Sequence, residues 1–478
     1  MNTWNWRFIM KETTEINWLE EVEKRKENLL SDLKGFLQIK STLDETTAGD
    51  GAPFGENIRR ALEYVLNIAE KDGFIVKNTE GYAGHIEYGN GDELLGVLGH
   101  VDVVPEGSGW DSDPFGAEIR NNRIYARGTI DDKGPVMAAY YGLKIVKELG
   151  FELNKRVRII LGCDEENEWR CVKHYFAKEE MPTFGFSPDA DFPIINAEKG
   201  LRDFTLNYTG KNIQHPDFKI LSFQSGERFN MVPEIAKAEV EMNPANIENT
   251  KIAFEAICIS AMYDYEFSVE GNIATFVVYG VSAHGSLPHQ GKNAGLKLAS
   301  FLANYTPNPY FRFIKNYIVA NEDGNRFGIA YSDEITKDLT INYGIFNYKS
   351  DGSCSIALNL RYPVTFDMDT AWKKIIDKAD SYLFEVNEKN HMKPHHVSAD
   401  SDLVRTLQKV YTEQTGMEAT LHSMGGATYA RSLEQGVAFG PLFPGQEDVV
   451  HQKNEYIGID ELVKVTAIYA QSLYELTR

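Results

Sequence analysis

The feature that most constrains the fold is an alternation of short apolar runs and helical stretches in the first 200 residues. The run Leu94–Leu98 is almost wholly apolar, which is typical of a strand buried on both faces of a sheet. A helix follows from Lys133, with Pro135 in its first turn, and Gly150 ends it. The next strand is Arg156–Leu161. Strands separated by helices pair in parallel through right-handed crossovers, so this part is predicted to be α/β.

The pattern changes twice further along the chain. Amphipathic helices are expected over Trp18–Ile39 and Asn57–Lys71, before the α/β part. After about residue 200 come short, mostly alternating strands, namely Leu201–Leu206, Ala236–Met242, Ile273–Tyr279 and Ser355–Leu360. They predict an α+β module with an antiparallel sheet. The alternation of strands and helices resumes from about Pro394, and the last element is a helix over Asp460–Leu476. We therefore predict a split first domain, 1–199 and 387–478, interrupted by an inserted domain, 200–386.

Charge and cysteine content narrow the classes of partner and compartment. The 478 residues include 49 Lys and Arg against 70 Asp and Glu, a net charge of −21. This balance argues against nucleic acid, because binding it depends on neutralising phosphates with Lys and Arg. The four cysteines show no CxxC spacing, the N-terminal segment does not resemble a secretory signal, and no apolar run approaches a membrane span. A cytoplasmic protein without a membrane partner is expected.

Potential metal ligands stand at three predicted strand ends and in one loop. His100 and Asp102 follow the first strand, Glu165 and Glu166 follow the second, and Asp189 follows a strand-like segment. The loop before the helix contributes the adjacent pair Asp131-Asp132. Each piece alone is weak, but carboxyl ends of strands in an open α/β sheet converge on one crevice.

The chemistry of these side chains points to divalent metal. Imidazole and carboxylate ligands suit Zn²⁺, Mn²⁺ or Co²⁺, and no thiolate set competes. A carboxylate that bridges two ions can support a shared water, while a second carboxylate moves its proton. Asp102 can accept the second imidazole N–H of His100 and so fix its tautomer.

The motifs around these residues resemble a known family. They are Gly99-His100-x-Asp102-x-Val104-Pro105, Gly128-x-x-Asp131-Asp132-Lys133-Gly134-Pro135 and Asp164-Glu165-Glu166. They resemble the co-catalytic metallopeptidases that include carboxypeptidase G, aminoacylase and dipeptidase V. Further motifs, which extend the resemblance over nearly the whole chain, look most like the bacterial dipeptidase V group. They are Ser187–Pro193, Val281–Ser286, Gly425–Arg431 and Val450–Glu455.

The resemblance implies a fold and a set of roles. The fold is a phosphorylase/hydrolase-like catalytic domain with a mixed, largely parallel sheet, and the insert is a lid. His100 and Asp189 bind one metal ion, Glu166 and His451 bind the other, and Asp132 bridges both. Glu165 is the general base and acid, and Asp102 orients His100. The two ions are expected to be Zn²⁺, with Mn²⁺ or Co²⁺ as alternatives.

The inserted domain is implied to supply further groups. His284 reaches the transition-state oxyanion, while Asn230 and Arg361 hold the C-terminal carboxylate of the substrate. The loop with Gly425, Gly426 and Thr428 lines the substrate pocket. Because the long insert carries its own histidine, the resemblance favours a monomer.

The leading hypothesis is a dipeptidase that hydrolyses short unblocked peptides through a hydroxide held by two metal ions, with Glu165 as general base. An N-acyl amino acid deacylase of the same superfamily is one alternative, and a catalytically silent peptide-binding protein is another. The intact Glu165 argues against the silent protein, since a binder does not need a carboxylate left free of the metals.

Overall fold

The structure is a computed structural model that describes residues 16–478. The chain forms two units. The first contains the described residues up to Asn196, together with Val397–His422 and Thr428–Arg478, and the second contains Ala197–His396 and Ser423–Ala427. Each unit is built around its own hydrophobic core. No helix in the described part of the chain combines the length and the apolar character needed to cross a bilayer.

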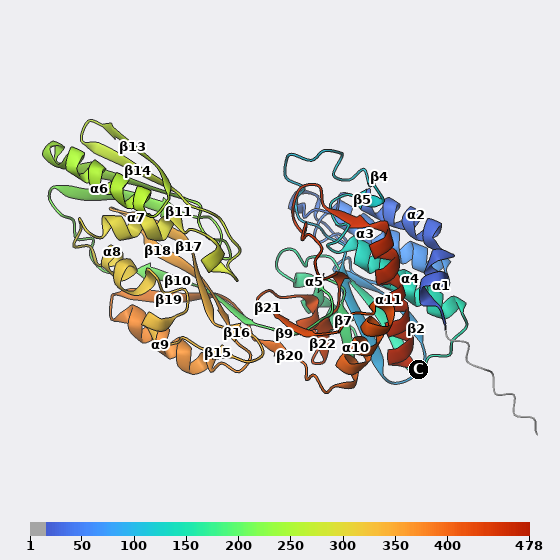
Figure 1. Ribbon diagram of the computed structural model, residues 1–478. Coiled ribbons are helices and arrows are strands. Elements are labelled where there is room, and N and C mark those ends of the chain that lie inside the picture. Colours follow the sequence, from blue (N-terminus) through green and yellow to red (C-terminus); the bar gives the residue numbers. More distant parts are fainter. Residues whose placement is uncertain (1–15) are drawn as a thin grey trace, which may run out of the picture. The chain divides into compact units, whose positions relative to one another are not determined.

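Most strands of a nine-stranded mixed sheet belong to the first unit (Figure 1). Its order is β1 (Ile75–Thr79), β2 (Ala83–Gly89), β6 (Arg156–Gly162), β3 (Leu94–His100), β7 (Phe184–Ser187), β22 (Gly436–Ala438), β9 (Ile194–Glu198) and β20 (His395–His396), with β21 (Leu421–Met424) also paired to β9. Strands β6, β3, β7 and β22 are parallel neighbours, whereas β1, β2, β9 and β20 join antiparallel. The expected mixed sheet is confirmed, but its parallel part is confined to the centre.

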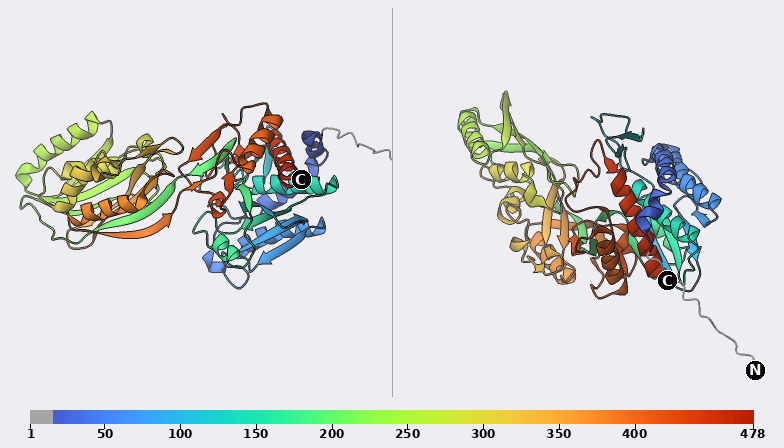
Figure 2. Two further views of the ribbon diagram at one scale, coloured as in Figure 1. Left: turned by 90° about the horizontal axis from the view of Figure 1, so that it is seen from below. Right: turned by 45° about the vertical axis from the view of Figure 1, so that its right-hand side comes forward.

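Helices cover this sheet and bury β3 along its whole length. They are α1 (Trp18–Glu23), α2 (Lys26–Leu37), α3 (Glu56–Lys71), α4 (Lys133–Glu148), α5 (Arg170–Phe176), α10 (Asp402–Thr415) and α11 (Ile459–Thr477). Helices α4 and α11 lie side by side, as Figures 1 and 2 show, with Gly142 of α4 against the backbone of Ala470.

The prediction of a single helix over Trp18–Ile39 is wrong, because the helix is interrupted between α1 and α2. The side chain of Arg25 donates from Nη1 to the carbonyl oxygen of Glu21 at 2.7 Å. In a continuous helix the Arg25 N–H would use that oxygen, but here it bonds to Val22 at 2.8 Å. The Arg25 side chain thus binds the carbonyl oxygen that its own backbone N–H would use in a continuous helix.

The second unit is an eight-stranded sheet in which all neighbouring strands are antiparallel, as expected. Its order is β13 (Asp264–Glu270), β14 (Ile273–Tyr279), β12 (Ile235–Met242), β11 (Phe218–Ser225), β17 (Thr340–Lys349), β18 (Cys354–Tyr362), β10 (Gly200–Tyr208) and β19 (Phe384–Met392). The last strand carries this sheet past residue 386. Alternate residues of β12 and β14 are buried, so these strands bury one face of the sheet and leave the other more open.

Helices of the second unit add to its core. They are α6 (Ile247–Ser260), α7 (Ala294–Leu302), α8 (Pro309–Phe313) and α9 (Met368–Asp380). Three small sheets complete the fold. They pair β4 (Glu118–Arg120) and β24 (Tyr456–Gly458) with β5 (Arg123–Tyr125), β8 (Ala190–Asp191) with β23 (Pro441–Leu442), and β15 (Ser332–Asp333) with β16 (Lys337–Asp338).

Candidate metal centre

The parallel strands β6, β3 and β7 bring the expected ligands to one edge of the first sheet. Strand β3 ends at His100, β6 ends just before the loop with Glu165 and Glu166, and β7 ends two residues before Asp189. Since these strands are neighbours and point the same way, their carboxyl ends lie together. Ligand atoms of His100, Asp131 and Glu166 lie within 4.8 Å of one another, and so do those of His100, Glu165 and Asp189.

His100 lies at the centre of this cluster and is fully buried. Its Nδ1 is 2.9 Å from the carbonyl oxygen of Asp102 and donates to it, so that in the neutral ring the lone pair is on Nε2. That Nε2 is 2.9 Å from Oδ1 of Asp131 and 3.8 Å from Oδ2 of Asp189. An acceptor thus faces other acceptors, and only a cation or a second proton satisfies them. A divalent ion bound at about 2.0–2.2 Å from each atom fits this donor set.

Asp131 connects the two histidines of the cluster. Its Oδ1 faces His100, and its Oδ2 is 2.9 Å from Nε2 of His451. The same His451 nitrogen is 3.1 Å from Oε1 of Glu166. One carboxylate therefore lies between the two imidazoles, with Glu166 beside the second.

The position that the sequence assigned to Asp132 is taken by Asp131, and Asp132 is not brought into the cluster. Oδ2 of Asp132 accepts the backbone N–H of His100 at 3.1 Å, and its Oδ1 is buried without a protein partner. Asp132 is the residue immediately before α4, and its side chain turns toward the backbone at the end of β3. The motif shows that two acids are adjacent, but it does not show which of their side chains points toward the histidines.

Asp102 supports the cluster through both its carbonyl and its carboxylate. The nearer partner of His100 is the Asp102 carbonyl, whereas the Asp102 carboxylate is 3.5 Å from the ring. The carboxylate oxygens accept the backbone N–H groups of Glu165 and Glu166, both at 3.2 Å. Asp102 therefore holds the loop after β6 in place against the end of β3.

The electrostatics of the cluster also favour bound cations. Burial raises the pKa of Glu165 and of Asp189 well above the usual range, and neighbouring carboxylates add to the effect. Burial acts in the same direction on Asp131, but hydrogen bonds with His100 and His451 outweigh it and lower the pKa. Burial tends to lower the pKa of His451, yet hydrogen bonds to Asp131 and Glu166 raise it to about 11. The buried or half-buried acids of the cluster outnumber its two imidazoles, so the protein's own positive charge does not balance them.

The residues expected to hold substrate on the insert form a group within the second unit. Nε of Arg361 donates to Oδ1 of Asn359 at 2.8 Å, and Nη1 donates to the carbonyl oxygen of Gly425. Asn230 and His284 lie on paired segments, because the Asn230 carbonyl accepts the N–H of Gly285 at 2.7 Å.

Ser286 is a neighbour that the sequence did not single out. Its hydroxyl is 2.7 Å from Nδ1 of His284, and a Cβ added to Gly425 would lie 2.8 Å from its Cβ. Ser286 therefore links the His284 segment to the Gly425 loop. In the sequence, only its position two residues after His284 could have indicated this role.

Gly426 and Thr428, the other two residues expected to line the pocket from the Gly425 loop, have different surroundings. A Cβ at Gly426 would lie 2.8 Å from Cε of Met424. Thr428 is buried, and its hydroxyl accepts the N–H of Ala430 to cap the short helix Tyr429–Ser432. The Thr428 side chain thus has a local structural partner in the first unit.

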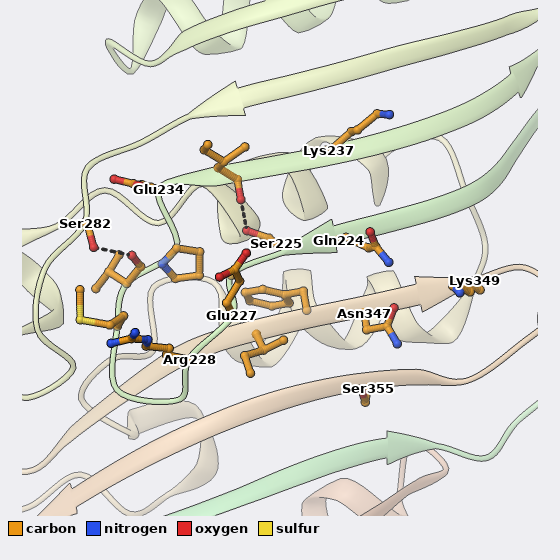
Figure 3. Close-up of a pocket in the computed structure, with 17 residues that line it drawn as sticks. Gln224, Ser225, Glu227, Arg228, Glu234, Lys237, Ser282, Asn347, Lys349 and Ser355 are labelled. Carbon is orange, nitrogen blue, oxygen red and sulfur yellow. Dashed lines mark hydrogen bonds between the residues drawn. The ribbon is translucent and has the colours of Figure 1, made fainter. Parts of the chain in front are cut away.

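A cavity of about 880 Å³ opens on the second unit (Figure 3). Gln224 of β11 and Asn347 and Lys349 of β17 line it, together with Glu227 and Arg228 of the loop that follows β11. None of the residues that the sequence assigned to metal or substrate belongs to this lining.

A mixed α/β sheet with histidines and carboxylates gathered at its carboxyl edge defines the class of protein, an α/β enzyme. Comparison with known proteins gives the family. The model of peptidase family M20/M25/M40 matches residues 96–475, so the chain belongs to this family and is a hydrolase of peptide bonds.

Named relatives cover almost the whole chain. A Bacillus subtilis protein named "Putative dipeptidase YtjP" is 50% identical over 469 residues, which is 97% of this chain and 100% of the relative. A "Putative dipeptidase" of Staphylococcus haemolyticus is 40% identical over 96% of this chain and 99% of its own. Human carnosine dipeptidase 1 shares the fold with a TM-score of 0.56 at 12% identity, over 96% of this chain and 98% of that one.

Proposed function

We propose that this peptidase is a metal-dependent dipeptidase of the dipeptidase V type, acting on short unblocked peptides. The observation that carries the metal dependence is Asp131, whose two oxygens each lie 2.9 Å from a histidine nitrogen. The names of the 50% and 40% identical relatives support the dipeptidase assignment.

The proposed ligand sets follow the sequence motifs with one change. His100 and Asp189 would hold one divalent ion, Glu166 and His451 would hold the other, and Asp131 would take the shared position that the motif assigned to Asp132. Ions bound there, Zn²⁺ in our proposal, would supply a Lewis acid for the peptide carbonyl and a lowered pKa for a nearby water.

Glu165 is the proposed proton carrier. It lies near His100 and Asp189, and the position of its backbone is fixed by Asp102. Burial raises the pKa of the Glu165 carboxyl, which helps it to take a proton from water and then donate it to the leaving amine.

The second unit supplies the proposed substrate contacts. His284 binds the oxyanion, and Arg361 and Asn230 bind the C-terminal carboxylate of the peptide. A guanidinium is suited to this because its planar fork matches a carboxylate. Asn359 and the Gly425 carbonyl hold the Arg361 side chain, which supports this role.

We also propose a monomeric, cytoplasmic enzyme. The inserted unit carries His284, Asn230 and Arg361 on one chain, which supports a monomer. All four cysteines are free and buried, in keeping with a reducing compartment.

The test is the variant Glu165→Gln. We expect it to keep about two zinc ions per chain, because Glu165 is not among the proposed ligands, and to lose turnover of dipeptides by at least about 10²–10⁴-fold. Metal analysis and a dipeptide hydrolysis assay measure both. Glu168→Gln, an exposed acid on the same loop, is the matched control and should retain full activity. Normal turnover in Glu165→Gln, or faster cleavage of N-acetyl amino acids than of dipeptides by the wild type, would contradict the proposal.

A further inference from the structure

A buried ion pair lies beside the candidate metal centre of the first unit. Arg127 is among the largest fully buried side chains of the described chain, and its Nη1 is 2.6 Å from Oε2 of Glu455, which is also fully buried. The two residues flank paired strands, since Tyr125 of β5 is opposite Tyr456 of β24. The Ala126 N–H also donates to the Glu455 carbonyl at 3.1 Å.

The free oxygen of Glu455 holds the turn that leads to Asp131. Oε1 accepts the backbone N–H of Ile130 at 2.9 Å and that of Asp131 at 3.4 Å. The hydroxyl of Thr129 lies 3.4 Å from the same oxygen. One carboxylate thus contacts three consecutive residues, Ile130 and Asp131 through the backbone N–H and Thr129 through its hydroxyl. The last of the three, Asp131, connects the two histidines.

Arg127 reaches the other side of the centre. Its Nη2 donates to the carbonyl oxygen of His451 at 3.3 Å and to that of Glu106 at 3.4 Å. His451 has a φ of 61°, a left-handed backbone conformation that is unfavourable for a residue with a side chain. The bond from Arg127 supports this unfavourable backbone.

The energetics argue against a role in stability alone. Taking two charges out of water costs several kcal/mol, and apolar replacements of buried ion pairs are often neutral or stabilising. Here Glu455 accepts the backbone N–H of Asp131, and Arg127 donates to the backbone carbonyl of His451. These residues approach each other to 2.9 Å from distant parts of the chain.

We propose that Arg127 and Glu455 form a positioning pair that sets the separation of Asp131 and His451, and thereby the affinity for the metal ion between them. This inference rests on the proposed function, because it assigns the pair to the second metal site. Neither side chain is placed as a metal ligand. Their effect is transmitted through the two backbone segments that they hold.

The test is zinc affinity in the full-length chain. Wild type, Glu455→Gln and Arg127→Met are stripped with a chelator, and zinc alone is titrated back against a chromophoric competitor. Glu455→Gln keeps an acceptor for the backbone N–H groups but loses the charge that pairs with Arg127. We expect one of the two zinc ions to bind about 10–100-fold more weakly in each variant, the range typical of groups that orient ligands. Turnover should recover at saturating zinc.

Arg158→Met is the matched control. It breaks another largely buried ion pair of the same unit, in which Nη2 of Arg158 is 2.6 Å from Oε2 of Glu87. Arg158 lies within strand β6 and not on the segments that carry Asp131 and His451. It should lower the thermal stability of the zinc-free protein and leave both zinc affinities unchanged. If a single variant does not fold, the charge-neutral double variant Arg127→Gln with Glu455→Gln is titrated in its place.

The outcomes separate the inference from the function on which it rests. Wild type that binds no zinc would overturn the proposed function. Wild type that binds two zinc ions, with unchanged affinities in the Arg127 and Glu455 variants, would overturn only the positioning role. An equal loss of affinity in Arg158→Met would also overturn it, because a general loss of stability would then be sufficient.

Discussion

At the scale of single residues, the adjacent acids Asp131 and Asp132 have the same charge but different surroundings. Both oxygens of Asp131 face histidine nitrogens, whereas Asp132 accepts a backbone N–H from His100. We expect Asp131→Asn to lose bound zinc, because an amide offers one neutral oxygen where the proposed site needs a shared anion. Asp132→Asn should keep about two ions per chain, since an amide oxygen can still accept the N–H. Metal analysis after dialysis against zinc-free buffer distinguishes the two.

Asn67→Ala is a suitable control for zinc lost during purification and dialysis, because Asn67 is exposed on α3 and remote in sequence from the motifs. Loss of zinc from Asp132→Asn together with retention in Asp131→Asn would return the shared-ligand role to Asp132. Circular dichroism of each variant establishes that the chain is folded before the metal is counted.

This pair also shows what the sequence can and cannot predict about the site. Strand ends predicted the gathering of His100, Glu165, Glu166 and Asp189, because the carboxyl ends of parallel strands must meet. The choice between two consecutive acids depends on the path of the backbone through one loop, which no residue spacing reports. The same is true of Asp102, whose carbonyl rather than carboxylate is the nearer partner of His100.

At the scale of helices and strands, periodicity predicted the elements whose buried faces are continuous. Strand β3 begins at Leu94 as expected, and α4 begins at Lys133. Periodicity missed the break between α1 and α2, because the apolar pattern does not change there. The structure shows a hydrogen bond from the Arg25 side chain at this point. A mixed sheet was expected, but which of its strands are antiparallel was not predicted, since apolar runs do not encode direction.

Close packing of α4 on α11 gives a prediction at this scale. Glycine within a helix is ordinarily about 1 kcal/mol less favourable than alanine, so Gly142→Ala would stabilise an isolated helix. Here the added Cβ would lie 2.9 Å from the backbone nitrogen of Ala470 and 3.3 Å from its Cα. Backbone atoms of a second helix cannot move aside as a flexible side chain can. We therefore expect Gly142→Ala to lower the free energy of unfolding by about 1–3 kcal/mol, as for other overpacked cores.

Chemical denaturation measures this change. Lys464→Ala, an exposed position on α11, is the control for a helix substitution without a steric conflict and should have little effect. A Gly142→Ala protein at least as stable as wild type would show that α4 and α11 separate at low cost.

At the scale of the whole molecule, the chain has two cores whose residues come from different parts of the sequence. The core of the second unit draws on buried residues between Phe204 and Phe384, and the first draws on residues before and after that stretch. The residue pattern, which changes near residue 200 and changes back near Pro394, predicts an insertion of this kind. Since each core is continuous within its own unit, each unit has what it needs to fold by itself.

We therefore expect the segment 197–396, expressed alone, to unfold cooperatively on heating, with a circular dichroism spectrum rich in β-structure. Within it Phe276 is fully buried on β14, with ring centroids 5.0 Å from Phe254 and 5.6 Å from Phe301. Phe276→Ala removes these contacts and leaves a cavity, so it should destabilise the segment by about 3–5 kcal/mol. In the full-length protein the same variant should leave zinc binding unchanged, because the proposed ligands all belong to the first unit. Lys237→Ala, whose exposed pair with Glu239 is worth little, is the control on the neighbouring strand. A segment without a cooperative transition, or zinc lost from the full-length Phe276→Ala protein, would mean that the two units depend on each other to fold.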